Sequence, residues 1–176
     1  MTLPCSRLLL SALVFLLGFS SFFAQTPSSP KNSIVIGVSM GAATPSGVSS
    51  VRSMRMAVEE INTAGGIKGR PLALKVEYGQ DKDSLNMDKT ITQLIADGAQ
   101  MIISGSGSSN TLRAARIAVA KGVMLMTAAS SSPRISEVKD NNLVWRTIPS
   151  DVFQANTAAK ILRQKKHTTV GIIAIN

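Results

Sequence analysis

Short stretches that are almost entirely apolar recur along residues 33–176, separated by longer amphipathic stretches. The apolar stretches at 33–40, 101–103 and 123–126 are typical of parallel strands that are buried on both faces. In the longer stretches, apolar residues return every three or four positions, which is typical of a helix with one buried face. Strands and helices therefore alternate. The pattern predicts an α/β fold, a three-layer sandwich with a mostly parallel, doubly wound sheet.

Three helices are predicted before the last of the three apolar strands, each with one apolar stripe. Glycines at 65–66, 98 and 122 are expected to end them, because glycine adopts positive φ without steric cost. Asp83 or Ser84 is a candidate cap for the second helix. The residues expected to face the core are Val48, Val51, Met54 or Arg55, Val58 and Ile61, then Met87, Ile91, Leu94 and Ile95, and finally Leu112, Ala115 and Val119.

The remaining elements are predicted from shorter patterns. Residues 72–78 alternate between apolar and polar, so they form a strand with one covered face, at an edge of the sheet. Further along, 143–147 is predicted to be a strand, 151–164 a helix and 170–175 a last apolar strand. No crossover helix follows that strand, so nothing in the sequence covers it.

Residues 1–24 have the pattern of a secretory signal. Arg7 precedes an uncharged run at 8–24 that is rich in Leu and Phe, as in a basic n-region followed by an apolar h-region. We expect cleavage after Ala24, although Phe22 at the −3 position is larger than signal peptidase prefers. The alternative is an N-terminal anchor, because 17 residues is at the lower limit for spanning a bilayer.

Composition narrows the class of protein. With 176 residues and 44% hydrophobic content, the chain can build about one domain core. The net charge of +9 is compatible with nucleic acid as a partner. However, Lys and Arg are scattered, and no basic run is interleaved with aromatic residues. We therefore expect a solvated basic surface and no nucleic-acid binding. The one cysteine, Cys5, lies in the leader, so we expect no disulfide and no cysteine chemistry after cleavage.

Two loops rich in serine each follow the carboxyl end of a predicted strand. In an open parallel sheet these ends lie side by side, and ligands bind in the crevice above them. The second half of the first loop opens a helix, whose free N–H groups and dipole attract an anion. The hydroxyl-bearing candidates are Ser106, Ser108, Ser109, Ser130 and Ser131.

Several ligand chemistries compete for these loops. The dinucleotide-binding fingerprint fails because it requires glycine where Asn110 stands, and no Gly-Lys-Ser/Thr of a P-loop is present. One helix end suits one negative charge, so a carboxylate is favoured over a nucleotide. The alternative is that the serines only cap the helix.

Catalysis has little support in the sequence. The only histidine, His167, precedes the last predicted strand and is expected at the end of the sheet opposite the loops. No G-x-S-x-G elbow is present, and serines without a base nearby are hydrogen-bond donors rather than nucleophiles. Asp81 and Asp83 are interpreted as turn and cap residues. We therefore predict no enzyme, no cofactor and no metal site.

Four segments carry a resemblance to a known family. They are AVEEINTAGGIKGRPL, ISGSGSSNT, GVMLMTAASSSP and VWRTIPSD, and they follow one another at the expected spacing. From about Ile34 to its last residue the chain resembles the N-terminal part of the leucine/isoleucine/valine-binding protein family. These are type I periplasmic solute-binding proteins of branched-chain amino acid ABC transporters. The resemblance implies a fold of two α/β lobes joined by three crossing segments, with the ligand clamped between the lobes.

The resemblance also implies roles for individual residues. Ser108 matches the position that gives a hydroxyl to the ligand carboxylate, assisted by N–H groups near Ser109. Ala129 matches a backbone carbonyl that accepts from the ligand ammonium, and Ser131 matches a second hydroxyl. Ser46 holds a place that is commonly aromatic, which argues against strict branched-chain specificity.

The implied ligand is a small amino acid or a related carboxylate or amide. The implied partner is a membrane permease of an ABC importer, and the implied location is periplasmic or extracellular. A ligand-sensing receptor or regulator of the same fold is the alternative function.

The expected domain organisation follows from these observations. We expect a linker at 25–32, a ligand-binding lobe at 33–150 and the start of a second, largely missing lobe at 151–176. The helix and strand after residue 150 would bury too little apolar surface to offset their ordering entropy, so we expect this part to be loose. A ligand that meets only one wall of its site is expected to bind weakly, with Kd about millimolar or higher.

Overall fold

The computed structural model describes residues 32–40, 44–78 and 84–173. Its sheet has five strands in the order β2-β1-β3-β4-β5, and every neighbouring pair is parallel. The elements are β1 Ile34–Met40, α1 Pro45–Thr63, β2 Leu72–Tyr78, α2 Ser84–Ala96, β3 Met101–Ser104, α3 Ser108–Ala120, β4 Met124–Thr127, η1 Pro133–Glu137, β5 Val144–Arg146 and α4 Asp151–Gln164.

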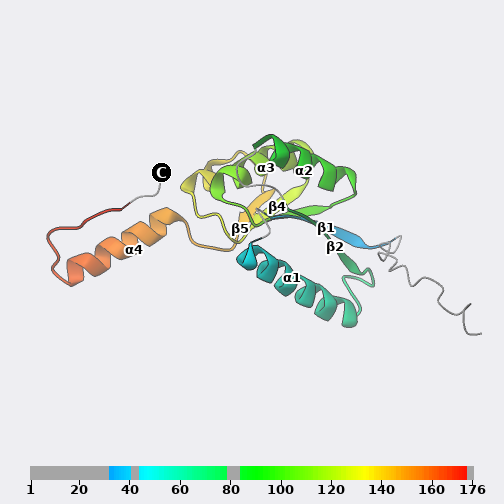
Figure 1. Cartoon of the computed structure of the whole chain (residues 1–176), viewed down its shortest axis with the longest axis horizontal. Coiled ribbons are helices and arrows are strands. Elements are labelled where there is room, and N and C mark those ends of the chain that lie inside the picture. The colour runs from blue at the N-terminus through cyan, green and yellow to red at the C-terminus, as the bar shows by residue number, and fades with distance from the viewer. Residues whose placement is uncertain (1–31, 41–43, 79–83, 174–176) are drawn as a thin grey trace, which may run out of the picture.

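The predicted three-layer α/β sandwich is confirmed. α2 and α3 cover one face of the sheet, and α1 lies against the other (Figure 1). β2 is an edge strand, as its alternating pattern predicts. This topology places the carboxyl ends of β1, β3 and β4 next to one another, which brings the loops that follow these strands together.

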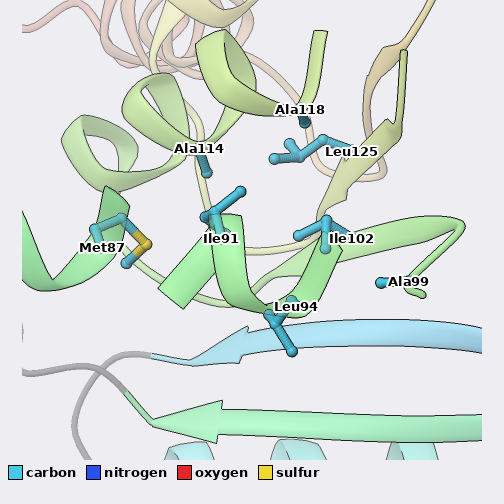
Figure 2. Close-up of a cluster of buried hydrophobic side chains, with 8 residues drawn as sticks. All are labelled: Met87, Ile91, Leu94, Ala99, Ile102, Ala114, Ala118 and Leu125. Atoms are coloured by element: carbon cyan, nitrogen blue, oxygen red, sulfur yellow. The ribbon is translucent and has the colours of Figure 1, made fainter. Parts of the chain in front are cut away.

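The larger apolar cluster lies between the sheet and the α2–α3 pair (Figure 2). The predicted stripe of α2 is confirmed, since Ile91 and Leu94 are fully buried there. For α3 the prediction is partly wrong. Ala115 is buried, but Leu112 and Val119 are only half-buried. Small side chains form most of the face of α3 that packs inward. Because they are small, α3 can lie close to α2 and the sheet. The buried residues of α3 are Thr111, Ala114, Ala115 and Ala118.

A polar contact joins α2 to α3, and glycines follow the end of α1. Arg113 of α3 donates to Asp88 of α2 through Nη2 at 2.8 Å and through Nε at 3.2 Å, which holds the two helices together. Gly65 and Gly66 follow α1 with φ of 99° and 73°, as expected of residues that end a helix. Asp83, a candidate cap of α2, lies outside the described residues.

The chain after β5 departs from the compact part. The predicted helix is present as α4, but none of its residues is buried and it stands away from the sheet (Figure 1). The strand predicted at 170–175 is wrong for 170–173, which have no secondary structure, and Ile173 is 99% exposed. A strand needs a neighbour to complete its hydrogen bonds, and none lies beside this segment among the described residues.

The predicted leader at 1–24, and all but the last residue of the predicted linker at 25–32, lie outside the described residues. Among the residues that are described, no helix has the length and apolar character needed to cross a membrane.

Candidate functional site

A pocket of about 690 Å³ opens where the loops after β1 and β3 meet the loop after β4. Thr44, Ser46, Gly107, Ser109 and Ala129 are exposed at its surface, so the pocket is open to solvent. Most of the lining residues are serine, threonine or glycine, and Met40 has the largest apolar side chain among them. The lining residues are Met40, Thr44, Ser46, Gly47, Ser50, Gly105, Ser106, Gly107, Ser108, Ser109, Asn110 and Ala129.

The amino end of α3 forms one wall of the pocket. Its N-cap is Gly107, which has no side chain, and no side-chain hydrogen bond caps the helix. The alternative that the serines only cap this helix is therefore wrong. The first bond within α3 runs from Thr111 N to Gly107 O at 3.0 Å. The N–H groups of the three preceding residues make no hydrogen bond within the described part of the chain, so they are available to an anion.

The loop after β1 supplies a second set of hydroxyls. Thr44 caps α1, because its Oγ1 accepts from Gly47 N at 3.2 Å. Ser46 Oγ lies 3.1 Å from Thr44 Oγ1, and both residues are exposed. Ser46 thus lines the pocket and puts a polar group there.

A buried network of hydroxyls lies beneath the pocket. Thr111 Oγ1 lies 2.8 Å from Ser104 Oγ and 2.7 Å from Ser130 Oγ. Ser130 Oγ in turn donates to Ser106 O at 2.9 Å. The network joins the β3–α3 loop to the loop after β4, so Ser130 has a structural position and does not face the ligand space. The hydroxyl of Ser106 is buried and has no hydrogen-bond partner among the described residues.

Residues outside the pocket make hydrogen bonds that fix the loop after β4. Ala129 lines the pocket, but Ser131 is half-buried and is not among the lining residues. The carbonyl of Ser131 accepts from Asp151 N at 2.9 Å and from Arg146 Nη1 at 3.4 Å. Ser132 N donates to Ser108 Oγ at 3.4 Å, which connects this loop to the start of α3.

The pocket is electrically neutral. None of its lining residues has a titratable side chain. The two ion pairs of the described residues lie elsewhere, where the hydrogen bond from Lys75 lowers the pKa of Asp97 and the hydrogen bond to Asp88 raises the pKa of Arg113. Within the described ranges, no three His, Cys, Asp or Glu residues gather as a metal site would require. The described lining residues offer hydrogen bonds from hydroxyls and backbone groups.

The structure brings together four of the five predicted site residues. Ser46, Ser108, Ser109 and Ala129 line one pocket, whereas Ser131 does not. Sequence reasoning missed Ser104 and Thr111, and it missed the contact of Arg146 with the loop after β4. The signal for Thr111 was available, since it is three residues before Ala114 and four before Ala115 on one face of a helix.

Known proteins resemble this chain over most of its length. The family model described as periplasmic binding protein matches residues 35–176. The Leu/Ile/Val-binding protein of Escherichia coli (strain K12) is 30% identical over 131 residues, which are 74% of this chain and 35% of that protein. The leucine-, isoleucine-, valine-, threonine-, and alanine-binding protein of Pseudomonas aeruginosa is 29% identical over 67% of this chain and 31% of its own length.

Solved structures give the same picture. An ABC transporter substrate-binding protein from Desulfitobacterium hafniense, in a complex with Leu, superposes with a TM-score of 0.65 at 29% identity. The match covers 77% of this chain and 40% of that one. The chain thus spans about a third of the length of the curated relatives that it matches.

Proposed function

Because the chain belongs to the periplasmic binding protein family, we propose that it forms the ligand-binding lobe of a solute-binding protein that serves an ABC importer. The observation that carries the proposal is the neutral, hydroxyl-lined pocket at the carboxyl ends of β1, β3 and β4. Such a pocket can hold a small zwitterion by hydrogen bonds and has no group that could break a bond in it. The relatives named above support the same function.

The ligand carboxylate is bound at the amino end of α3. It accepts from the Ser108 hydroxyl and from the free N–H groups of Ser109 and Asn110, with the helix dipole adding to the attraction. The carbonyl of Ala129 accepts from the ligand ammonium. Ser131 lies outside the described pocket, so we assign no direct ligand contact to its hydroxyl.

The lining favours a small amino acid. Ser46 is polar, and Met40 is the largest apolar side chain that a ligand could contact in the described pocket. A long aliphatic side chain would therefore bury little apolar surface against this lobe, and burial of apolar surface is its main source of binding energy. Among L-alanine, L-threonine and L-leucine, we expect L-alanine and L-threonine to bind at least as tightly as L-leucine.

Calorimetric titration with these three amino acids tests the function. Ser108→Ala removes a hydrogen bond to a charged group, and it is expected to weaken binding by about 10- to 100-fold. Ser53→Ala is the matched control, because the Ser53 hydroxyl donates to Ser49 O on the exposed face of α1 and does not line the pocket. Equal affinity of the Ser108→Ala variant and the wild type would reject this site.

The apolar run at 8–24 supports export as part of the proposed function, because a solute-binding protein works outside the cytoplasm. We expect residues 1–32 to deliver a reporter enzyme that is active only outside the cytoplasm. A fusion that stays inactive, while the same reporter with an established signal is active, would contradict this part of the proposal.

A further inference from the structure

Arg146 lies at the end of β5 and binds the loop after β4 through three hydrogen bonds. Its Nη1 donates to Ser132 O at 2.9 Å and to Ser131 O at 3.4 Å, and its Nη2 donates to Ser136 Oγ at 2.6 Å. The side chain is half-buried, and no carboxylate pairs with it among the described residues. The charge of Arg146 is therefore directed at this loop, and hydrogen bonds from a charged donor are stronger than those between neutral groups.

The peptide group between Ser131 and Ser132 is held at both ends. Its carbonyl oxygen accepts from Arg146 and also from Asp151 N at 2.9 Å. Its N–H donates to Ser108 Oγ at 3.4 Å. A peptide group is planar, so fixing the direction of its carbonyl also fixes the direction of its N–H. The contacts of Arg146 and Asp151 therefore set where this N–H meets Ser108.

This contact determines what the Ser108 hydroxyl can do. A serine hydroxyl has one hydrogen to donate and two lone pairs to accept with. When Ser132 N–H occupies one lone pair, the hydroxyl hydrogen is directed away from that donor. Ser108 lines the pocket, so the hydrogen is then available to an acceptor in the pocket such as a carboxylate.

We propose that Arg146 is a positioning residue for ligand binding, which acts through the Ser131–Ser132 peptide group to orient the Ser108 hydroxyl as a donor. The proposal rests on the proposed function, because it requires that Ser108 binds the ligand carboxylate. It adds a residue that lies outside the pocket and lines no part of it. It also makes the segment from Arg146 to Asp151 part of the binding apparatus.

A double-mutant cycle with L-alanine as the probe tests the proposal. In the full chain, Arg146→Ala is expected to weaken L-alanine binding by about tenfold, within the range of measured couplings between contacting residues. In the Ser108→Ala background the same substitution is expected to change the affinity by less than about twofold, because the group that it orients is absent. Arg134→Ala is the matched control, since Arg134 of η1 is exposed and makes no hydrogen bond in the described part of the chain.

A purely structural role of Arg146 would give a different result. It would lower affinity by the same factor in both backgrounds, and that outcome, or no loss in either, overturns the inference while the proposed function stands. If Ser108→Ala binds L-alanine as the wild type does, the proposed function fails, and the inference fails with it. Arg146→Lys keeps a charged donor without the planar fork, so its affinity should be intermediate. If Arg146→Ala does not fold, the cycle is run with Arg146→Lys, where additive losses again overturn the inference.

Discussion

The hydroxyl of Thr111 connects α3 to β3 and to the loop after β4. It is fully buried and lies within hydrogen-bonding distance of both Ser104 Oγ and Ser130 Oγ. Valine has nearly the same shape but no hydroxyl, so Thr111→Val would leave buried polar atoms without their partner. We expect the free energy of unfolding to fall by about 1–3 kcal/mol, measured by urea denaturation.

Thr63→Val is the control for this prediction. Thr63 is exposed on α1, where its hydroxyl bonds Glu59 O at 2.8 Å. Its replacement should change stability by only a few tenths of a kcal/mol, because water can satisfy the freed carbonyl. Equal effects of the two substitutions would show that the buried network does not stabilise the fold.

At the scale of single residues, the sequence predicted which candidate residues lie together better than it predicted the direction of each side chain. Ser108 and Ala129 follow neighbouring parallel strands, and that position alone places them near the same crevice. The direction of Ser131 depends on how its carbonyl is bound by Arg146 and Asp151, which are distant in sequence from the loop. No local pattern carries that information.

At the scale of elements, α2 supplies three of the eight buried residues of the larger apolar cluster. Leu94 is fully buried in the larger cluster (Figure 2), so Leu94→Ala should lower the free energy of unfolding by about 2–5 kcal/mol. Ile161 of α4 is 46% exposed, and Ile161→Ala should change it by less than about 0.5 kcal/mol. Thermal or urea unfolding of both variants checks this, and a large effect of Ile161→Ala would show that α4 packs against another surface.

The ion pair between Asp97 and Lys75 of β2 predicts that the stability of the fold depends on pH. Asp97 Oδ2 lies 2.5 Å from Lys75 Nζ, and hydrogen bonds from Lys75 and Gln93 lower the pKa of Asp97. A carboxyl whose pKa is lowered by folding stabilises the fold above its unfolded pKa of about 4, and this stabilisation is lost as the pH falls through the folded value. The advantage in Tm of the wild type over Asp97→Asn should therefore shrink below about pH 4.

Thermal unfolding between about pH 7 and about pH 2 measures this difference. Glu60→Gln is the control, because Glu60 is exposed on α1 and its side chain has no partner in the described residues. A difference between wild type and Asp97→Asn that stays constant down to the lowest pH would contradict the prediction.

The strands predicted correctly are those that pair with a neighbouring strand. α2, β2 and the apolar strands have patterns that match the surfaces they bury. The segment at 170–173 is as apolar as a buried strand, yet it is exposed and has no strand beside it among the described residues. Apolar character predicts that a segment is suited to burial, but a strand forms only where another strand can pair with it.

At the scale of the whole molecule, the described chain has a packed part and an unpacked part. α4 has 14 residues, none of them buried, and an isolated helix of that length is marginal in water. We expect the amides of α4 that follow Asp151 to exchange with deuterium nearly as fast as those of an unfolded peptide. Those of Ile102 and Leu125, which are fully buried, should exchange only on global unfolding. Equal protection of α3 and α4 would contradict this expectation.

The neutral lining of the pocket has a consequence for the thermodynamics of capture. No side chain of the lining takes up or releases a proton between about pH 5 and pH 8, and a zwitterionic amino acid does not do so either. The heat of L-alanine binding should therefore be the same in phosphate and in Tris, whose ionisation enthalpies differ widely. A heat that varies with the buffer would reveal a titrating group in contact with the ligand. A lobe built in this way holds its solute with the same strength in mildly acidic and mildly alkaline surroundings.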